Sequence, residues 1–105
     1  MDFNTYQALA KRTAIYPRAH QIIYPTLGLC GEAGEVAEKI KKALRDKNGL
    51  FDRQALLKEL GDVLWYLANL SADLDIPLDD VARANLEKLA DRACRDVLGG
   101  EGDER

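Results

Sequence analysis

The chain has 105 residues, of which 47% are hydrophobic and 31% are charged, and this composition is typical of a single folded domain. Its net charge of −3 argues against a protein that binds nucleic acid without sequence preference, because such proteins present a basic surface to phosphates. The sequence shows no signal-peptide pattern and no uncharged apolar run long enough to span a bilayer, so we expect a cytoplasmic protein that does not contact a membrane.

Apolar residues recur three and four positions apart along most of the chain, and strand-like alternation is absent. Turn residues divide this pattern into four predicted helices, near residues 2–15, 24–46, 52–74 and 78–98. Because the connections are short, neighbouring helices should run antiparallel. The sequence therefore predicts an all-α fold, a four-helix up-and-down bundle.

The predicted helices form one domain over residues 1–98. Residues 99–105 are rich in glycine and polar, which favours a mobile C-terminal tail. Asp52 and Asp79 stand at the starts of the third and fourth helices, where a carboxylate can accept from unpaired backbone N–H groups. We expect both to act as caps.

Two pairs of carboxylates occur on the second and third predicted helices. Glu32 and Glu35 lie three residues apart, as do Glu59 and Asp62, so each pair shares one side of its helix beside an apolar stripe. If the two helices pack antiparallel, the four carboxylates can converge. An isolated Glu-x-x-Glu is typical of a solvated helix edge, and it is the presence of two pairs on adjacent helices that favours a site.

Converging carboxylates require a cation between them, because like charges repel and partly buried charges lose hydration. Ligands that are all oxygen suit magnesium or manganese and offer nothing soft for zinc or copper. A di-iron bundle needs Glu-x-x-His on two helices, and the chain has a single histidine, His20.

The fourth predicted helix carries the complementary charge. Asn85, Lys88 and Arg92 form one polar stripe, from which a lysine and an arginine can bind phosphate oxygens and an asparagine can donate from its amide. On its own the stripe could equally be a solvated face. Together with the four carboxylates it indicates a site for a metal-bound triphosphate.

Residues 28–38, which read Gly-Leu-Cys-Gly-Glu-Ala-Gly-Glu-Val-Ala-Glu, and residues 58–66, which read Lys-Glu-Leu-Gly-Asp-Val-Leu-Trp-Tyr, carry a resemblance to a known family. The chain resembles the MazG-like nucleoside triphosphate pyrophosphohydrolases, whose signature is Glu-x-x-Glu, a spacer and Glu-x-x-Asp. The spacer between Glu35 and Glu59 has 23 residues, within the usual range of the family. The similarity continues through the fourth helix to the Gly-x-Gly-Asp tail.

The resemblance implies that Glu32, Glu35, Glu59 and Asp62 hold magnesium, with manganese as a possible substitute. It also implies that Asn85, Lys88 and Arg92 approach the phosphates of a nucleoside triphosphate. A homodimer or homotetramer is implied, with the bundle completed between chains. The third helix agrees, because Trp65 and Ala68 lie away from its main apolar stripe and need cover.

The implied reaction is attack of water on the α-phosphorus, which yields a nucleoside monophosphate and pyrophosphate. Glu35, or in its place Glu38, is the expected general base, although Glu38 could equally be an ordinary surface residue. Aromatic residues that could stack on the nucleobase, together with the histidine, are Tyr6, Tyr16, His20 and Tyr24.

Three alternatives remain open at this stage. The enzyme could remove non-standard or damaged nucleotides, or it could be a specialised relative that acts on dUTP, dCTP or phosphoribosyl-ATP. A helical module that binds nucleotide and metal without turnover is the non-enzymatic alternative.

Overall fold

The computed structural model describes all residues from 1 to 105 and contains helices but no strands. The expected all-α class is confirmed, as is the number of long helices. The elements are α1 (Phe3–Lys11), a short 3-10 turn (Arg18–His20), α2 (Ile23–Asp46), α3 (Arg53–Asp73) and α4 (Leu78–Cys94). The first and fourth helices end earlier than the periodicity predicts. None of the helices combines the length and the apolar character that crossing a bilayer requires.

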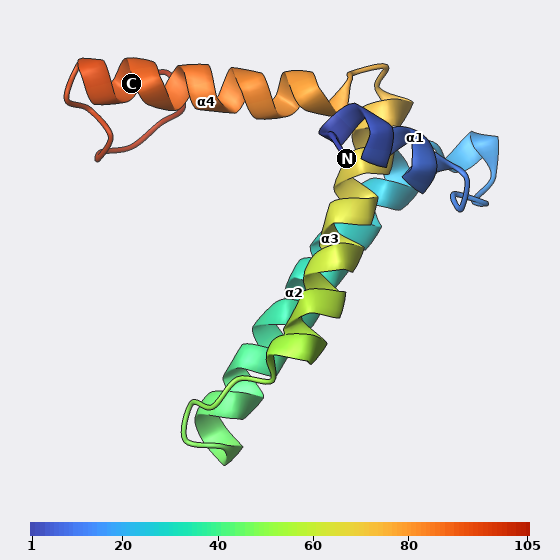
Figure 1. Ribbon diagram of the computed structural model, residues 1–105, viewed down its shortest axis with the longest axis vertical. Coiled ribbons are helices and arrows are strands. Elements are labelled where there is room, and N and C mark those ends of the chain that lie inside the picture. The colour runs from blue at the N-terminus through green and yellow to red at the C-terminus, as the bar shows by residue number, and fades with distance from the viewer.

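Helices α2 and α3 form a long antiparallel hairpin, and they lie side by side along its whole length (Figure 1). The turn between them uses Gly49, whose φ of +78° favours glycine. Asp52 then caps α3 by accepting from the backbone N–H groups of Gln54 and Ala55, each at 3.1 Å. The Asp52 cap was therefore predicted correctly from the sequence.

Helix α1 packs across the open end of the hairpin, where the small core of the chain lies (Figure 1). Ala10, Ala68 and Leu78 are buried there, and Tyr6, Trp65 and Leu67 pack around them. Gln7 fixes this corner: its amide N–H groups donate to the carbonyls of Ala68 and Ile76, and its oxygen accepts from the N–H of Leu78.

The start of α4 is capped by helix α1 and not by its own side chains. Asn4 accepts from the N–H of Asp79 at 3.0 Å, and Gln7 accepts from the N–H of Leu78 at 3.0 Å. The predicted Asp79 cap was wrong, because the Asp79 carboxylate instead pairs with Arg83 one turn along the helix. These contacts hold the first turn of α4 against α1 and α3, and the rest of α4 points away from the hairpin (Figure 1).

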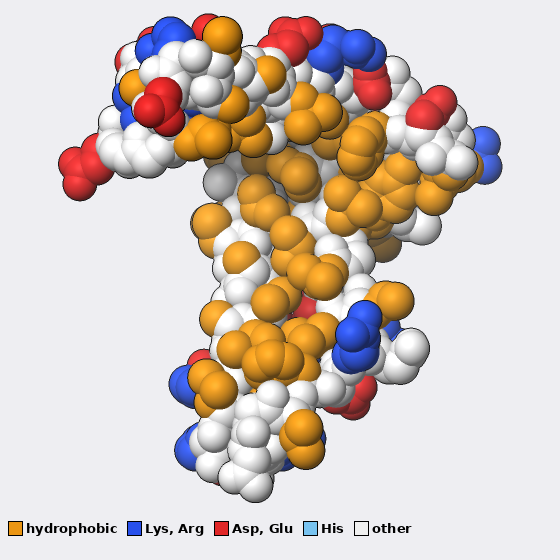
Figure 2. Space-filling view, turned by 60° about the vertical axis from the view of Figure 1, so that its left-hand side comes forward, with side chains coloured by type: hydrophobic (Ala, Val, Ile, Leu, Met, Phe, Trp, Pro, Cys, Tyr) orange, Lys and Arg blue, Asp and Glu red, His pale blue; other side chains and the backbone are white.

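One chain therefore does not close a four-helix bundle. Only 8 of 105 residues are buried, and large apolar side chains remain exposed on both the hairpin and α4. Figure 2 shows hydrophobic side chains gathered along the hairpin and beneath the part of the molecule that crosses the upper end of the hairpin. Among them are Leu27, Leu57, Leu60 and Leu86, each between 57% and 68% exposed.

The residues that need cover differ in part from those expected. Ala68 is completely buried within the chain, so its expected need for a second chain was wrong. Trp65 is half-buried, with its indole N–H donating to Thr13 at 2.8 Å, and it keeps part of its surface exposed. The exposed leucines of the hairpin and α4 add further apolar surface that the chain itself does not cover.

The C-terminal tail folds back on α4. The guanidinium of Arg105 donates to several tail carbonyls, among them those of Val97 and Gly99. Asp103 binds Lys88 and Arg92 on α4. The tail is thus tied to its helix by charged hydrogen bonds, which are stronger than neutral ones.

Candidate metal and phosphate site

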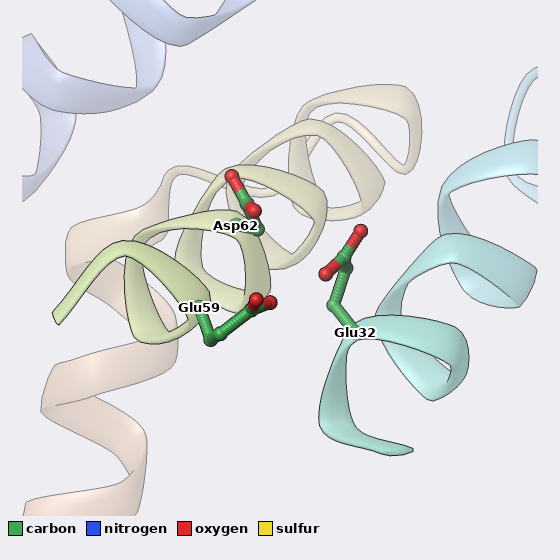
Figure 3. Close-up of side chains that lie close together, drawn as sticks. All are labelled: Glu32, Glu59 and Asp62. Carbon is green, nitrogen blue, oxygen red and sulfur yellow. The ribbon is translucent and has the colours of Figure 1, made fainter. Parts of the chain in front are cut away.

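Three of the four predicted carboxylates come together midway along the hairpin. Glu32 projects from α2, and Glu59 and Asp62 project from successive turns of α3, so that one oxygen of each lies within 4.8 Å of the others. Figure 3 shows Glu32 facing the two α3 carboxylates across the gap between the helices. The three residues are called the carboxylate cluster below.

The cluster carries more negative charge than the chain neutralises. Burial, together with the nearby charges of Asp62, Glu59 and Glu35, raises the pKa of Glu32 above its usual value. The cation beside the cluster is Lys39, whose Nζ lies 3.7 Å from Oε1 of Glu59. Three carboxylates and one ammonium leave two negative charges, which suits a divalent cation bound through oxygen.

Glu35 and Glu38 lie outside the cluster. Glu35 is exposed, yet it is close enough to contribute to the raised pKa of Glu32. Glu38 is also exposed, and its carboxylate is bound by Lys41 at 2.8 Å and by Lys42 at 3.8 Å. The hydrogen bond from Lys41 is the main cause that lowers the pKa of Glu38, which makes it a weaker base.

A row of aromatic rings leads from the N-terminal part of the chain toward the carboxylate cluster. Tyr16 stacks on Tyr24 with ring centroids 4.8 Å apart, and Tyr24 lies 6.3 Å from Tyr66. Tyr66 is followed by Trp65, edge-on at 5.0 Å. Burial is the main cause of the raised pKa of Tyr66, and the charges of Glu32 and Asp62 add to it, which shows that this ring borders the cluster.

Helix α2 approaches Tyr66 closely because residue 28 is glycine. A Cβ built at Gly28 would collide with the Tyr66 ring, so any larger residue would force the ring or the helix to shift. Gly28 precedes Glu32 by one turn, and Tyr66 follows Asp62 by one turn. The same glycine thus sets the spacing of the two helices beside the cluster.

The four residues expected to bind the nucleobase are placed at different distances from the cluster. Tyr6 packs against the small core of Ala10, Ala68 and Leu78, where burial, with a smaller effect of the Asp62 charge, raises its pKa, and Tyr24 contacts Tyr66. Tyr16 lies one ring further out, and its hydroxyl donates to Asp73 at 2.8 Å. His20 is exposed on the 3-10 turn.

The predicted phosphate stripe lies on the arm formed by α4. Asn85 is exposed, whereas Lys88 donates to the Asp103 carboxylate at 2.7 Å. Arg92 is 5% exposed and donates to both the carbonyl and the carboxylate of Asp103. Within one chain the stripe is therefore held by the tail, on the part of the molecule that leads away from the hairpin (Figure 1).

Two neighbours of the cluster were not among the residues singled out as its site. Tyr66 shares an edge of α3 with Glu59 and Asp62, and its i, i+4 spacing from Asp62 was the signal available. Lys39 lies seven residues after Glu32, which places it two turns along the same side of α2. Both residues reach the cluster because α2 and α3 pack closely.

The chain is similar to known proteins. A family model described as the MazG nucleotide pyrophosphohydrolase domain matches residues 22–95. The chain is also similar to the "Gene 37 protein" of Mycobacterium phage L5, at 47% identity over 114 aligned positions that cover all of both chains. No solved structure matches the chain. The matched segment holds the carboxylate cluster, Tyr66 and the polar stripe of α4, and the chain belongs to the MazG nucleotide pyrophosphohydrolase family.

Proposed function

We propose that this protein is a magnesium-dependent pyrophosphohydrolase that converts a nucleoside triphosphate and water into a nucleoside monophosphate and pyrophosphate. The observation that carries the proposal is the carboxylate cluster, in which Glu32, Glu59 and Asp62 meet with only Lys39 to balance them. Such an arrangement is unfavourable without a cation, and oxygen ligands favour magnesium or manganese.

The residues of the cluster fit a magnesium ion, because their oxygens converge on one point and offer no soft ligand. Glu32, Glu59 and Asp62 would hold the ion, with Glu35 at the edge of the set. When bound, magnesium supplies neutralisation of the polyphosphate charge and a lowered pKa for water. The chain itself then orients the nucleotide, whose base would lie toward Tyr66 and Tyr24.

The proton of the attacking water requires a carboxylate that is not fully committed to the metal. Glu35 fits this role best, because it lies one turn from Glu32 and outside the three-residue cluster. Glu38 is held by two lysines and has a lowered pKa. We therefore assign the general base to Glu35.

Initial rates of pyrophosphate release test this proposal. The panel contains ordinary, deaminated and oxidised nucleoside triphosphates together with dUTP, dCTP and phosphoribosyl-ATP, each with magnesium and with a chelator. Release from at least one compound with magnesium, and none with the chelator, supports the enzyme. Binding of nucleotide with no release from any compound would instead identify a binding module.

We further propose that the protein assembles as a homodimer or homotetramer in the cytoplasm. Exposed leucines on the hairpin and α4 supply a face that a second chain can cover. Because α4 points away from its own hairpin, we propose that its polar stripe of Asn85, Lys88 and Arg92 approaches the carboxylate cluster of the partner chain (Figure 1). This arrangement would unite the two halves of the triphosphate site.

A charge placed on this apolar face should separate the chains. Leu57→Glu on α3 and Leu86→Glu on α4 each replace an exposed leucine, 63% and 67% exposed, with a carboxylate that an apolar interface cannot bury without a large cost. We expect both variants to sediment as smaller species than the wild type and to lose most activity. Leu98→Glu, at a 55% exposed leucine beyond α4, is the matched control and should leave assembly unchanged. A fully active wild-type monomer would contradict the proposed assembly.

The charge of the cluster also predicts how metal and pH act on stability. The raised Glu32 pKa means that the folded protein binds protons more tightly than the unfolded chain, so in chelator stability falls as pH rises through that raised pKa. Magnesium that binds the folded protein stabilises it by RT ln(1 + [L]/Kd), about 2.7 kcal/mol at a hundredfold excess over Kd, and its affinity rises once Glu32 is deprotonated. Thermal melts should therefore show a larger magnesium effect at pH 8 than at pH 5. Glu32→Gln should raise the melting temperature in chelator at pH 8 and remove most of the stabilisation by magnesium. If magnesium stabilised the wild type equally at both pH values, the cluster would not be the metal site.

A further inference from the structure

A pocket opens at the turn of the α2–α3 hairpin, beyond the carboxylate cluster. Its volume is about 190 Å³, below the roughly 300–1,000 Å³ of pockets that take drug-sized ligands. Lys39, Lys42 and Lys47 supply its basic side, and Phe51 and Leu56 are part of its apolar wall. We call it the lysine pocket.

The lysine pocket has an excess of positive charge. Its one lining carboxylate, Asp52, accepts the two backbone N–H groups at the start of α3 and is committed to that cap. Lys47 forms no ion pair, and Lys42 has only a 3.8 Å contact with Glu38, whose closer partner is Lys41 at 2.8 Å. Two ammonium groups are thus available to an anion of small size.

The pocket is linked to the carboxylate cluster through Lys39. Lys39 lines the pocket, and its Nζ lies 3.7 Å from Glu59 in the cluster. Along α2, Lys39 is seven residues beyond Glu32, or about 10 Å at 1.5 Å per residue. On the opposite side of Glu32, one turn earlier, Gly28 meets the ring of Tyr66. The hairpin therefore presents aromatic rings, carboxylates and lysines in that order.

From this order we propose that the lysine pocket receives the leaving pyrophosphate, so that the nucleotide lies along the hairpin with its base toward Tyr66 and its terminal phosphates toward Lys42 and Lys47. The proposal rests on the proposed function and adds an orientation to it. Lysine binds phosphate as a point charge, and two or three ammonium groups match the charge of pyrophosphate. The apolar wall limits the pocket to a compact group and keeps the lysine stems in place.

Calorimetric titration of the metal-free protein with inorganic pyrophosphate tests the pocket without any turnover. The double variant Lys42→Gln/Lys47→Gln should bind pyrophosphate at least about tenfold more weakly than the wild type, since each lost charged hydrogen bond contributes about 1.5–3 kcal/mol. Lys41→Gln is the matched control, because Lys41 is a neighbouring lysine that does not line the pocket. The control should bind as the wild type does.

Three results would overturn the proposal: no binding of pyrophosphate to the wild type, equal weakening in Lys41→Gln, or unchanged binding in the double variant. A double variant that instead loses affinity for the nucleoside monophosphate would reverse the orientation, and it too would overturn the proposal. These outcomes are independent of hydrolysis. If the wild type hydrolyses nucleotides but one of these binding results is found, the proposed function stands and the assignment of the lysine pocket is wrong. If the wild type binds pyrophosphate through these lysines but hydrolyses no nucleotide, the proposed function is wrong.

Discussion

Glu32→Gln, Glu59→Gln and Asp62→Asn should each reduce turnover by more than about a hundredfold while the helical content stays unchanged. Each substitution keeps the size of the side chain and removes a charged oxygen from the cluster, in which the three carboxylates lie within 4.8 Å of one another. Loss of an outer-shell partner alone costs about 10- to 100-fold in metal sites, so loss of a direct ligand should cost more. Pyrophosphate release and circular dichroism measure the two effects.

A matched control is Glu87→Gln, which removes an exposed carboxylate of α4 outside the cluster. Its rate should equal that of the wild type. Because the cluster is unfavourable without metal, the three ligand variants should also be at least as stable as the wild type in chelator. Wild-type rates in all three would show that catalysis does not depend on the cluster.

Lys88→Ala should lower kcat/KM by about ten- to a hundredfold without changing the metal affinity of the nucleotide-free protein. A charged hydrogen bond to phosphate contributes about 1.5–3 kcal/mol, and the loss falls on nucleotide or transition-state binding. In the structure Lys88 is paired with Asp103, so phosphate must replace that carboxylate. Substrate-dependent rates and a separate metal titration distinguish this loss from loss of the metal.

Arg83→Ala is the matched control for Lys88, since Arg83 is a cation of the same helix that pairs with Asp79. It should retain the wild-type kcat/KM. Arg92 is a poorer test, because it is buried and holds the tail through Asp103, so its removal also loosens the C-terminus. Full activity of Lys88→Ala would mean that Lys88 does not bind the triphosphate, and that the lysine pocket supplies its cations without the help of α4.

The features that sequence analysis predicted correctly depend on local spacing. Carboxylates three residues apart share a helix side whatever the helix packs against, and the Asp52 cap acts within three residues. The short turn at Gly49 forces α2 and α3 to be antiparallel neighbours, so Glu32 had to lie near Glu59 and Asp62. Only Glu35 stays outside the cluster, although its spacing from Glu32 equals that of Glu59 from Asp62, so the sequence pattern alone does not distinguish it from the other three.

The features that sequence analysis did not predict depend on contacts between distant segments. The first N–H groups of α4 bond to Asn4 and Gln7, more than 70 residues away, and periodicity carries no information about such partners. Likewise, an apolar stripe on α4 shows that the helix needs cover but does not show whether its own hairpin provides it. The contacts by which Asp103 and Arg105 bind the tail to α4 and to its own backbone are also not visible in the sequence pattern.

The most direct test of the central claim is a phosphorus NMR spectrum of the wild-type protein with magnesium and its preferred nucleoside triphosphate. The account predicts that nucleoside monophosphate and pyrophosphate appear together in equal amounts, and that neither appears with chelator or with Asp62→Asn. Formation of nucleoside diphosphate and inorganic phosphate, or cleavage that persists in chelator, would contradict it.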